Sequence, residues 1–298
     1  MPGVPYPVYT VGQKASYTRS LSQNDFNRFA ALSGDDNPIH CDPAFAATSH
    51  FGATVSHGML LYSAMCKAFT EGLPGPGWVQ HAQEFMFPNP TFVDEPVTFS
   101  LEVTAVEDGV LAMTTNVNKA DGTPCAVGKA VLRSVNSGAP YPAQPSSLGE
   151  TGGEPFYGLV VGQHVSDTRT FTAADVAEYV SLVGDTNPLH ADEAGAKAAG
   201  LKGQSVPPPL LAGMFSDILG TRLPGRGTGW MKQKLNYHGP AYVGEALTAR
   251  VEIIRLRADK ELVNLATTVT TASGQRVVTG EALVLVRNLE DKINPKGD

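Results

Sequence analysis

A chain of 298 residues is long enough for two domains that each bury a core, and its 42% hydrophobic and 17% charged residues are ordinary for globular proteins. The net charge of −7 opposes binding to a polyanionic phosphate backbone, so we expect no nucleic acid partner. No run of about 18 apolar residues occurs, so we expect no membrane partner.

The cysteines and the start of the chain bear on the compartment. Cys41, Cys66 and Cys125 are too few and too scattered for a disulfide framework, and an odd number leaves at least one thiol unpaired. The first residues show no basic region followed by an apolar stretch, as a secretory signal would. We therefore expect a reducing, cytoplasmic location.

The first predicted element is a helix over 22–32. Ser22 can cap its N-terminus, Asp25 lies in the first turn, and apolar residues then recur at helical spacing. Thr172 and Asp175 begin the same pattern later in the chain. The sequence thus predicts two equivalent helices.

A short motif, Gly-Asp-x-Asn-Pro-Ile/Leu-His, follows each of these helices, ending at His40 and at His190. Five helical steps would leave its Asp and His on different faces, and the intervening proline resists regular helix. We therefore expect a shaped loop that brings the carboxylate and the imidazole together, with a water between them. Asp42 and Asp192, two residues beyond each motif histidine, favour helix N-caps rather than catalytic groups.

A central helix and a meander of strands come next. Residues 58–69 are apolar on nearly all sides, which is typical of a helix enclosed by a larger element. Three runs with strand composition follow at 97–106, 110–117 and 124–135, and they predict an antiparallel meander. One helix enclosed by an antiparallel sheet, twice over, is an α+β architecture.

An internal repeat organises the whole chain. Val11-Gly12-Gln13 recurs as Val161-Gly162-Gln163, a displacement of 150 positions. The stretch 136–155 is rich in Pro, Gly and Ser and is typical of a linker. We therefore predict domains at 1–135 and 156–298 that pack as an intramolecular pseudo-dimer, and further association into a homodimer stays open.

The Asp and His of each motif suit the addition of water to a conjugated thioester. That reaction needs a base for the water and an acid for the α-carbon, and histidine exchanges protons near neutral pH. The charge that develops on the thioester oxygen also needs backbone N–H donors, which a helix start supplies. His57-Gly58, at the head of the central helix, is placed to provide them.

These features resemble the MaoC-like (R)-specific enoyl-CoA hydratases. The matching parts are the motif in both halves, the segment Phe51-Gly52 through Val55-Ser56-His57-Gly58-Met59-Leu60, and the Leu-Pro-Gly sequences at Leu73 and Leu223. The resemblance implies a tandem (double) hot-dog fold, reversible hydration of a trans-2-enoyl thioester to the (R)-3-hydroxyacyl thioester, an acyl-CoA or acyl-carrier substrate, no metal and no other cofactor. By the same resemblance the water is activated by Asp35 and His40, and likewise by Asp185 and His190; Asn37 and Asn187 position the site, and the Gly58 amide stabilises the enolate oxygen.

The second half departs from this pattern at one position. Pro208 stands where the first half has Gly58, and proline has no N–H to donate. The sequence therefore predicts a stronger site at Asp35 and His40, and a weaker or re-purposed one at Asp185 and His190.

Three alternatives remain at the sequence level. His40, His50 and His57 could suggest a metal, but their counterparts are His190, Gly200 and Pro207, and the spacing fits no zinc pattern. A hot-dog thioesterase would share the fold and the substrate class but release free thiol. A non-catalytic acyl-thioester binding module would bind without turnover, although unneeded buried carboxylates cost stability.

Overall fold

The computed structural model describes residues 8–137, 141 and 150–287, in two halves with the same order of elements. The first half contains β1 (Lys14–Ser20), α1 (Gln23–Ser33), α2 (Pro38–Cys41), α3 (Pro43–Thr48), α4 (Gly58–Lys67), β2 (Trp78–Met86), β3 (Pro96–Glu107), β4 (Val110–Lys119) and β5 (Pro124–Ser134). The second half contains β6 (His164–Thr170), α5 (Ala173–Val183), α6 (Pro188–Ala191), α7 (Glu193–Ala198), α8 (Pro208–Asp217), β7 (Gly229–Tyr237), β8 (Ala246–Arg257), β9 (Leu262–Thr271) and β10 (Arg276–Leu285).

Helix α1 begins and ends where its local chemistry requires. The Asp25 N–H donates to Ser22 Oγ at 3.2 Å and the Ser22 N–H donates to the Asp25 carboxylate at 2.8 Å, which forms a capping box. Gly34 ends the helix at a φ of 88°, a left-handed conformation that favours glycine. The helix predicted over 22–32 is confirmed, and α5 repeats it with Thr172, Asp175 and Gly184 in the same roles.

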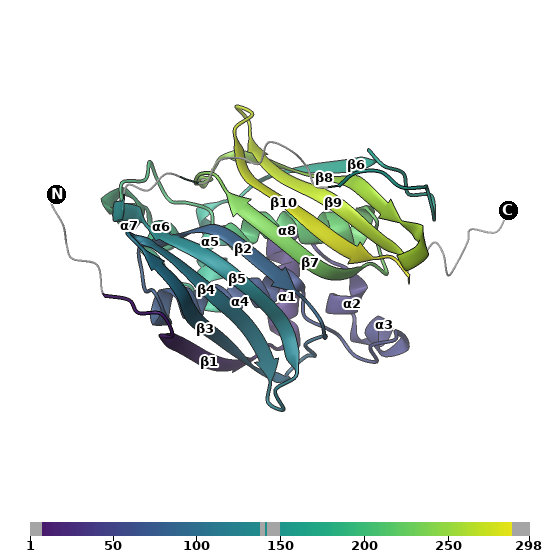
Figure 1. Ribbon diagram of the computed structural model, residues 1–298, viewed down its shortest axis with the longest axis horizontal. Helices are drawn as coiled ribbons and strands as arrows, with labels where there is room; N and C mark the ends of the chain where they lie inside the picture. Colours follow the sequence, from purple (N-terminus) through teal and green to yellow (C-terminus); the bar gives the residue numbers. More distant parts are fainter. Residues whose placement is uncertain (1–7, 138–140, 142–149, 288–298) are drawn as a thin grey trace.

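The ten strands of the described residues form one continuous antiparallel sheet in the order β1-β3-β4-β5-β2-β7-β10-β9-β8-β6. The halves join at β2 and β7, where Glu84 lies opposite Lys234 and forms an ion pair with Lys232 at 2.5 Å. Figure 1 shows the sheet curving over the helices from one half to the other. The two halves are therefore continuous through backbone hydrogen bonds, as in a pseudo-dimer.

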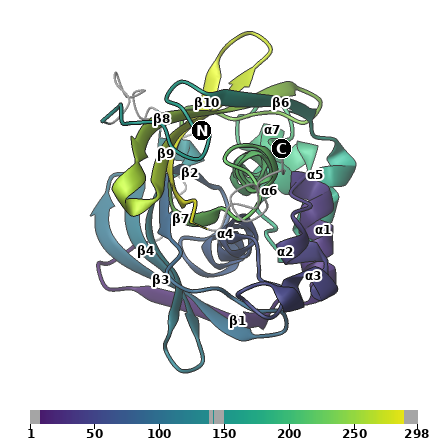
Figure 2. The ribbon, with the colours of Figure 1, turned by 90° about the vertical axis from the view of Figure 1, so that its right-hand side faces the viewer.

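Helices α4 and α8 fill the concave side of this sheet. Along α4 every residue from Met59 to Cys66 is buried, and α8 is buried in the same way from Pro209 to Ser216. The end-on view in Figure 2 shows both helices side by side at the centre, with strands on one side and α1, α2 and α5 on the other. The predicted central helix is confirmed, together with the α+β double hot-dog architecture.

The central helix differs from the prediction at its C-terminal end. The α-helix stops at Lys67, and a π-helical turn occupies Ala68–Gly72. A π turn shifts the register of side chains relative to an α-helix, and such turns are frequent at functional sites. Here it carries Thr70, which contacts the opposite half.

The predicted meander is confirmed as β3, β4 and β5, whereas β2 was not predicted. In β2 the polar Gln80 and Gln83 point inward and are buried, so the strand lacks the apolar alternation expected of a core strand. The linker predicted at 136–155 lies largely outside the described residues, and the domain bounds stay a prediction. No helix in the described ranges is both long and apolar enough to cross a membrane.

Candidate active site

The motif of the first half folds as a loop that leads into a single helical turn. Asn37 caps this turn by accepting the Ile39 N–H on its side-chain oxygen at 3.2 Å, and Pro38 takes the first helical position. His40 lies on the turn, while Asp35 lies in the loop before it. The loop expected from the sequence is confirmed for the residues before Pro38 and is wrong for Pro38–Cys41, which is helical; Asp42 is confirmed as the N-cap of α3.

Asp35 is 2% exposed, and its partners come from both halves. Ser216 Oγ, on α8, donates to Oδ2 at 2.6 Å, and the Asn37 N–H donates to Oδ1 at 3.3 Å. Asn37 in turn donates its side-chain N–H to the Gly220 carbonyl at 2.9 Å. Burial raises the pKa of Asp35 above its ordinary value, although His40 and the Ser216 hydrogen bond act in the opposite direction.

His40 is held in one tautomer by the backbone. Its Nδ1 lies 2.7 Å from the Val55 carbonyl oxygen, and because that oxygen can only accept, Nδ1 carries the proton. In the neutral ring, Nε2 is then a proton acceptor. His40 lines the same cavity as Asp35, so this half presents a carboxylate and an imidazole to one space.

His57 is fully buried beneath this pair. Its ring centroid lies 3.8 Å from that of His40, and its Nε2 lies 3.0 Å from the Asp35 carbonyl oxygen. Nδ1 of His57 has no hydrogen-bond partner among the described residues. Burial lowers the pKa of His57 well below its ordinary value, so the ring is neutral at neutral pH.

The cavity of the first half has a volume of about 270 Å³. Gly58, the first residue of α4, lies on its wall together with Phe87. A methyl group on Gly58 would lie 3.0 Å from the Phe87 ring, so a larger residue could fit only if this ring shifted. The first N–H groups of a helix have no partner within the helix, so the Gly58 N–H is available to a ligand. Trp230 and Leu219 of the other half complete an apolar wall.

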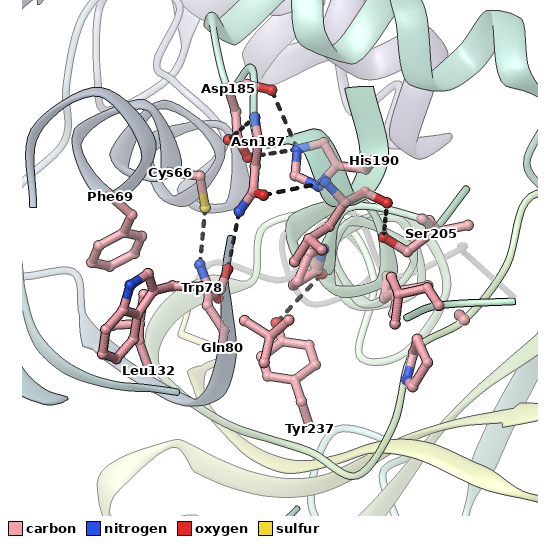
Figure 3. Close-up of a pocket in the computed structure, with 18 of the residues that line it drawn as sticks. Cys66, Phe69, Trp78, Gln80, Leu132, Asp185, Asn187, His190, Ser205 and Tyr237 are labelled. Carbon is pink, nitrogen blue, oxygen red and sulfur yellow. Dashed lines mark hydrogen bonds and ion pairs between the residues drawn. The ribbon is translucent and has the colours of Figure 1, made fainter. Parts of the chain in front are cut away.

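The second half repeats the motif, but here the Asp185 and His190 side chains contact each other directly (Figure 3). Thr70 Oγ1 donates to Asp185 Oδ1 at 2.6 Å, and Asn187 donates to the Trp78 carbonyl at 3.0 Å, so both partners again belong to the opposite half. His190 Nε2 lies 3.0 Å from Asp185 Oδ2 and 3.2 Å from the Asp185 carbonyl oxygen. The carboxylate and the imidazole are in direct contact, without the intervening water that the sequence predicted.

The cavity beside this second pair has a volume of only about 60 Å³. Pro207 caps α8 and Pro208 is its first residue, so no N–H is available where Gly58 supplies one in the first half. Tyr237 stands at the position of Phe87, with its hydroxyl 3.4 Å from the Pro208 carbonyl oxygen and 2.9 Å from the Tyr62 hydroxyl. The two sites therefore differ in the donor at the helix start, in the spacing of Asp and His, and in open volume.

A possible metal site within the described residues involves Asp35, His40 and His57, whose ligand atoms lie within 4.8 Å of one another. The two imidazole rings are stacked with an interplanar angle of 31°. His40 directs Nδ1 to the Val55 carbonyl and His57 directs Nε2 to the Asp35 carbonyl, so one nitrogen of each ring already faces a backbone oxygen. The cluster offers three ligands from one half, fewer than the four of a closed structural zinc site.

Sequence reasoning missed the partners that come from the opposite half. Ser216 donates a hydrogen bond to Asp35, and the residue at the equivalent position of the first half is Cys66. Thr70 donates to Asp185, and the residue at its equivalent position in the second half is Gly220. Because the two hydroxyl donors do not occupy equivalent positions in the two halves, comparing the halves by sequence does not reveal them. Ser216 lies on the last turn of α8 and Thr70 on the π-helical turn after α4, and their contacts could be recognised only once the two halves were packed together.

The sequence matches the MaoC like domain over residues 9–123 and the FAS1-like, dehydratase domain region over residues 160–280. A stretch of 126 residues, 42% of this chain, is 42% identical to the (R)-specific enoyl-CoA hydratase of Aeromonas caviae and covers 94% of that protein. Another alignment of 133 residues, 44% of this chain, is 33% identical to a mitochondrial 3-hydroxyacyl-[acyl-carrier-protein] dehydratase of Solanum lycopersicum and covers 79% of it.

Solved structures show the same fold over nearly the whole chain. A MaoC-like dehydratase superposes with a TM-score of 0.75 at 16% identity, covering 92% of this chain and 98% of its own. A conserved hypothetical protein of Mycobacterium tuberculosis, described as a double hotdog fold, superposes with a TM-score of 0.71 at 13% identity, covering 93% and 96%. At these identities the likeness concerns the fold, whereas the sequence matches establish the relationship. This chain therefore belongs to the MaoC-like dehydratase family, in its double hot-dog form.

Proposed function

We propose that this protein is an enoyl-thioester hydratase, working reversibly, and that the reaction takes place at Asp35 and His40 in the first half. The observation that carries the proposal is the placing of these two side chains on the wall of a cavity of about 270 Å³ that also contains the start of α4. The names of the sequence relatives, an enoyl-CoA hydratase and a 3-hydroxyacyl dehydratase, support the same reaction class.

Each part of the reaction has a group on this wall. A water between the Asp35 carboxylate and Nε2 of His40 loses a proton to the pair as its oxygen bonds to the β-carbon of the substrate. The electrons of the double bond move to the thioester oxygen, and the N–H of Gly58 at the positive end of α4 stabilises the resulting enolate. A proton from the Asp35–His40 pair then passes to the α-carbon, which completes the addition of water.

The substrate is a trans-2-enoyl thioester of coenzyme A or of an acyl carrier, and the product is the (R)-3-hydroxyacyl thioester. The apolar wall, which includes Leu61, Phe87, Leu219 and Trp230, suits the acyl chain. Asn37 positions the site by tying the motif to the Gly220 carbonyl of the other half. Asp185 and His190, with Asn187, form the weaker or re-purposed pair.

The test follows two signals at once with a short trans-2-enoyl-CoA: the absorbance of the conjugated double bond and the appearance of free thiol. We expect the absorbance to fall without thiol release, and the change to be lost in the double variant Asp35→Asn/His40→Gln. Release of thiol would make the protein a thioesterase instead. Saturable binding of enoyl-CoA with neither signal would make it a binding module.

A further inference from the structure

The two motif sites differ in which side chain contacts the carbonyl oxygen of the motif aspartate. In the first half His57 Nε2 lies 3.0 Å from the Asp35 carbonyl oxygen, whereas in the second half the motif histidine itself, His190, lies 3.2 Å from the Asp185 carbonyl oxygen. The counterpart of His57 is Pro207, which has no side-chain donor. Where the extra histidine is missing, the motif histidine takes over its hydrogen bond.

This exchange coincides with a change in the ring nitrogen that carries the proton. His40 donates from Nδ1 to the Val55 carbonyl at 2.7 Å, so its neutral form has the proton on Nδ1. His190 approaches a carbonyl oxygen with Nε2, so Nε2 carries the proton there, and the same nitrogen lies 3.0 Å from the Asp185 carboxylate. The first pair has an imidazole acceptor facing a cavity, while the second has an imidazole donor bound to its aspartate.

His57 also supports the ring of His40 directly. The two ring centroids lie 3.8 Å apart with the rings tilted by 31°, and Phe29 packs edge-on against His57 at a centroid distance of 5.1 Å. His57 is fully buried, and its Nδ1 has no hydrogen-bond partner among the described residues. A buried acceptor without a partner costs free energy, so stability alone does not account for a histidine at this position.

We infer that His57 is a positioning residue, which donates to the Asp35 carbonyl and packs against the ring of His40. With the Asp35 carbonyl already bonded, His40 keeps its hydrogen bond to Val55, and space for a water remains between Asp35 and His40. His57 does not line the cavity and acts only through its two neighbours. In the second half Pro207 removes this support, and the pair closes into direct contact beside a cavity of about 60 Å³. The inference rests on the proposed hydratase function for its catalytic consequence, while its structural part can be tested separately.

The structural part is tested by ¹⁵N NMR of histidine-labelled protein, with the His40 and His190 signals assigned from the spectra of His40→Gln and His190→Gln. We expect the unchanged protein to show protonated Nδ1 at His40 and protonated Nε2 at His190. In His57→Phe, which keeps an aromatic ring but loses the donor, the His40 proton is expected to move to Nε2. A His40 that keeps its Nδ1 proton in this variant overturns the inference, whether or not the protein is a hydratase.

The catalytic part uses the same variants in the hydration assay. His57→Phe is expected to lower kcat by about 100-fold, the scale of a misplaced catalytic group, with KM nearly unchanged because the cavity wall is intact. His57→Gln keeps an N–H donor in nearly the same place and should recover part of kcat and the Nδ1 proton of His40, which also covers the case that His57→Phe does not fold. His164→Gln, at an exposed histidine on β6, is the matched control and should change neither signal. An unchanged kcat in both His57 variants would overturn the catalytic part.

Discussion

Ser216 donates a hydrogen bond of 2.6 Å to the carboxylate of Asp35, although the two residues belong to opposite halves of the chain. Thr70 and Asp185 form the reciprocal contact at 2.6 Å. The aspartate of each motif therefore accepts a hydrogen bond from a hydroxyl group of the opposite half. Neither half by itself contains a complete site, which explains why the pseudo-dimer is built around the two central helices.

Removing the hydroxyl of Ser216 should therefore affect both stability and activity. Ser216→Ala leaves a buried carboxylate short of one donor, and we expect it to lower the free energy of unfolding by about 1–3 kcal/mol. Because this donor also lowers the pKa of Asp35, its loss should raise that pKa further. Denaturant unfolding and the hydration assay measure the two effects. Thr70→Val is the matched variant of the second half; a larger loss of hydration there than in Ser216→Ala would contradict the assignment.

The pH dependence of hydration should reflect the buried carboxyl group. The pKa of Asp35 is raised, mainly by burial, and the reaction needs the carboxylate form to accept a proton from water. On acidification the rate should therefore fall at a higher pH than for an ordinary aspartate. A profile of kcat against pH checks this. An acid limb at or below the range of a solvent-exposed carboxyl group would show that another group limits the rate.

Stability should respond to the same residue in the opposite sense. A carboxyl group whose pKa is raised in the fold contributes stability below its unfolded pKa and loses that contribution as the pH rises through the folded value. At neutral pH Asp35 therefore destabilises the protein. Asp35→Asn should raise the free energy of unfolding by about 1 kcal/mol and should therefore unfold at a higher denaturant concentration. The difference should shrink in acid. A variant that is less stable than the parent at neutral pH would contradict this.

Gly58 should not tolerate a side chain. A methyl group there would meet the Phe87 ring at 3.0 Å, so Gly58→Ala must displace either the ring or the first turn of α4. Because the Gly58 N–H is the proposed donor to the enolate, we expect kcat to fall by at least about tenfold. The double variant Gly58→Ala/Phe87→Leu relieves the clash and should regain part of the loss. No recovery there would mean that the defect does not come from this contact.

The amino-acid sequence predicts much of the fold because its signals are local or repeated. The capping box at Ser22, the helix after Gly58 that is apolar on nearly all sides, and the meander of β3 to β5 all depend on residues close together in the chain. Strand β2 was missed because Gln80 and Gln83 are buried, and polar residues at core positions hide the alternation. The side-chain amide groups of both glutamines donate to Cys66 and Thr115, partners that only the folded chain brings close.

The site was predicted in part because its motif is also local in the chain and repeated. The motif places Asp35, Asn37 and His40 within six residues, so the repeated pattern is visible in the sequence. The hydroxyl of Ser216 and the stacking of His57 on His40 depend on packing between distant segments, and the sequence could not show them. The exchange of Gly58 for Pro208 predicted unequal sites, but the direct contact of His190 with Asp185 emerged only from the structure.

The central claim, that hydration takes place at the first of the two motif sites, is tested most directly by comparing two single variants. Asp35→Asn and Asp185→Asn are each assayed with the same short trans-2-enoyl-CoA, after circular dichroism has shown that both are folded. We expect Asp35→Asn to lose at least about 1,000-fold in kcat and Asp185→Asn to keep most of the activity. Equal losses in the two variants, or a greater loss in Asp185→Asn, would contradict the account.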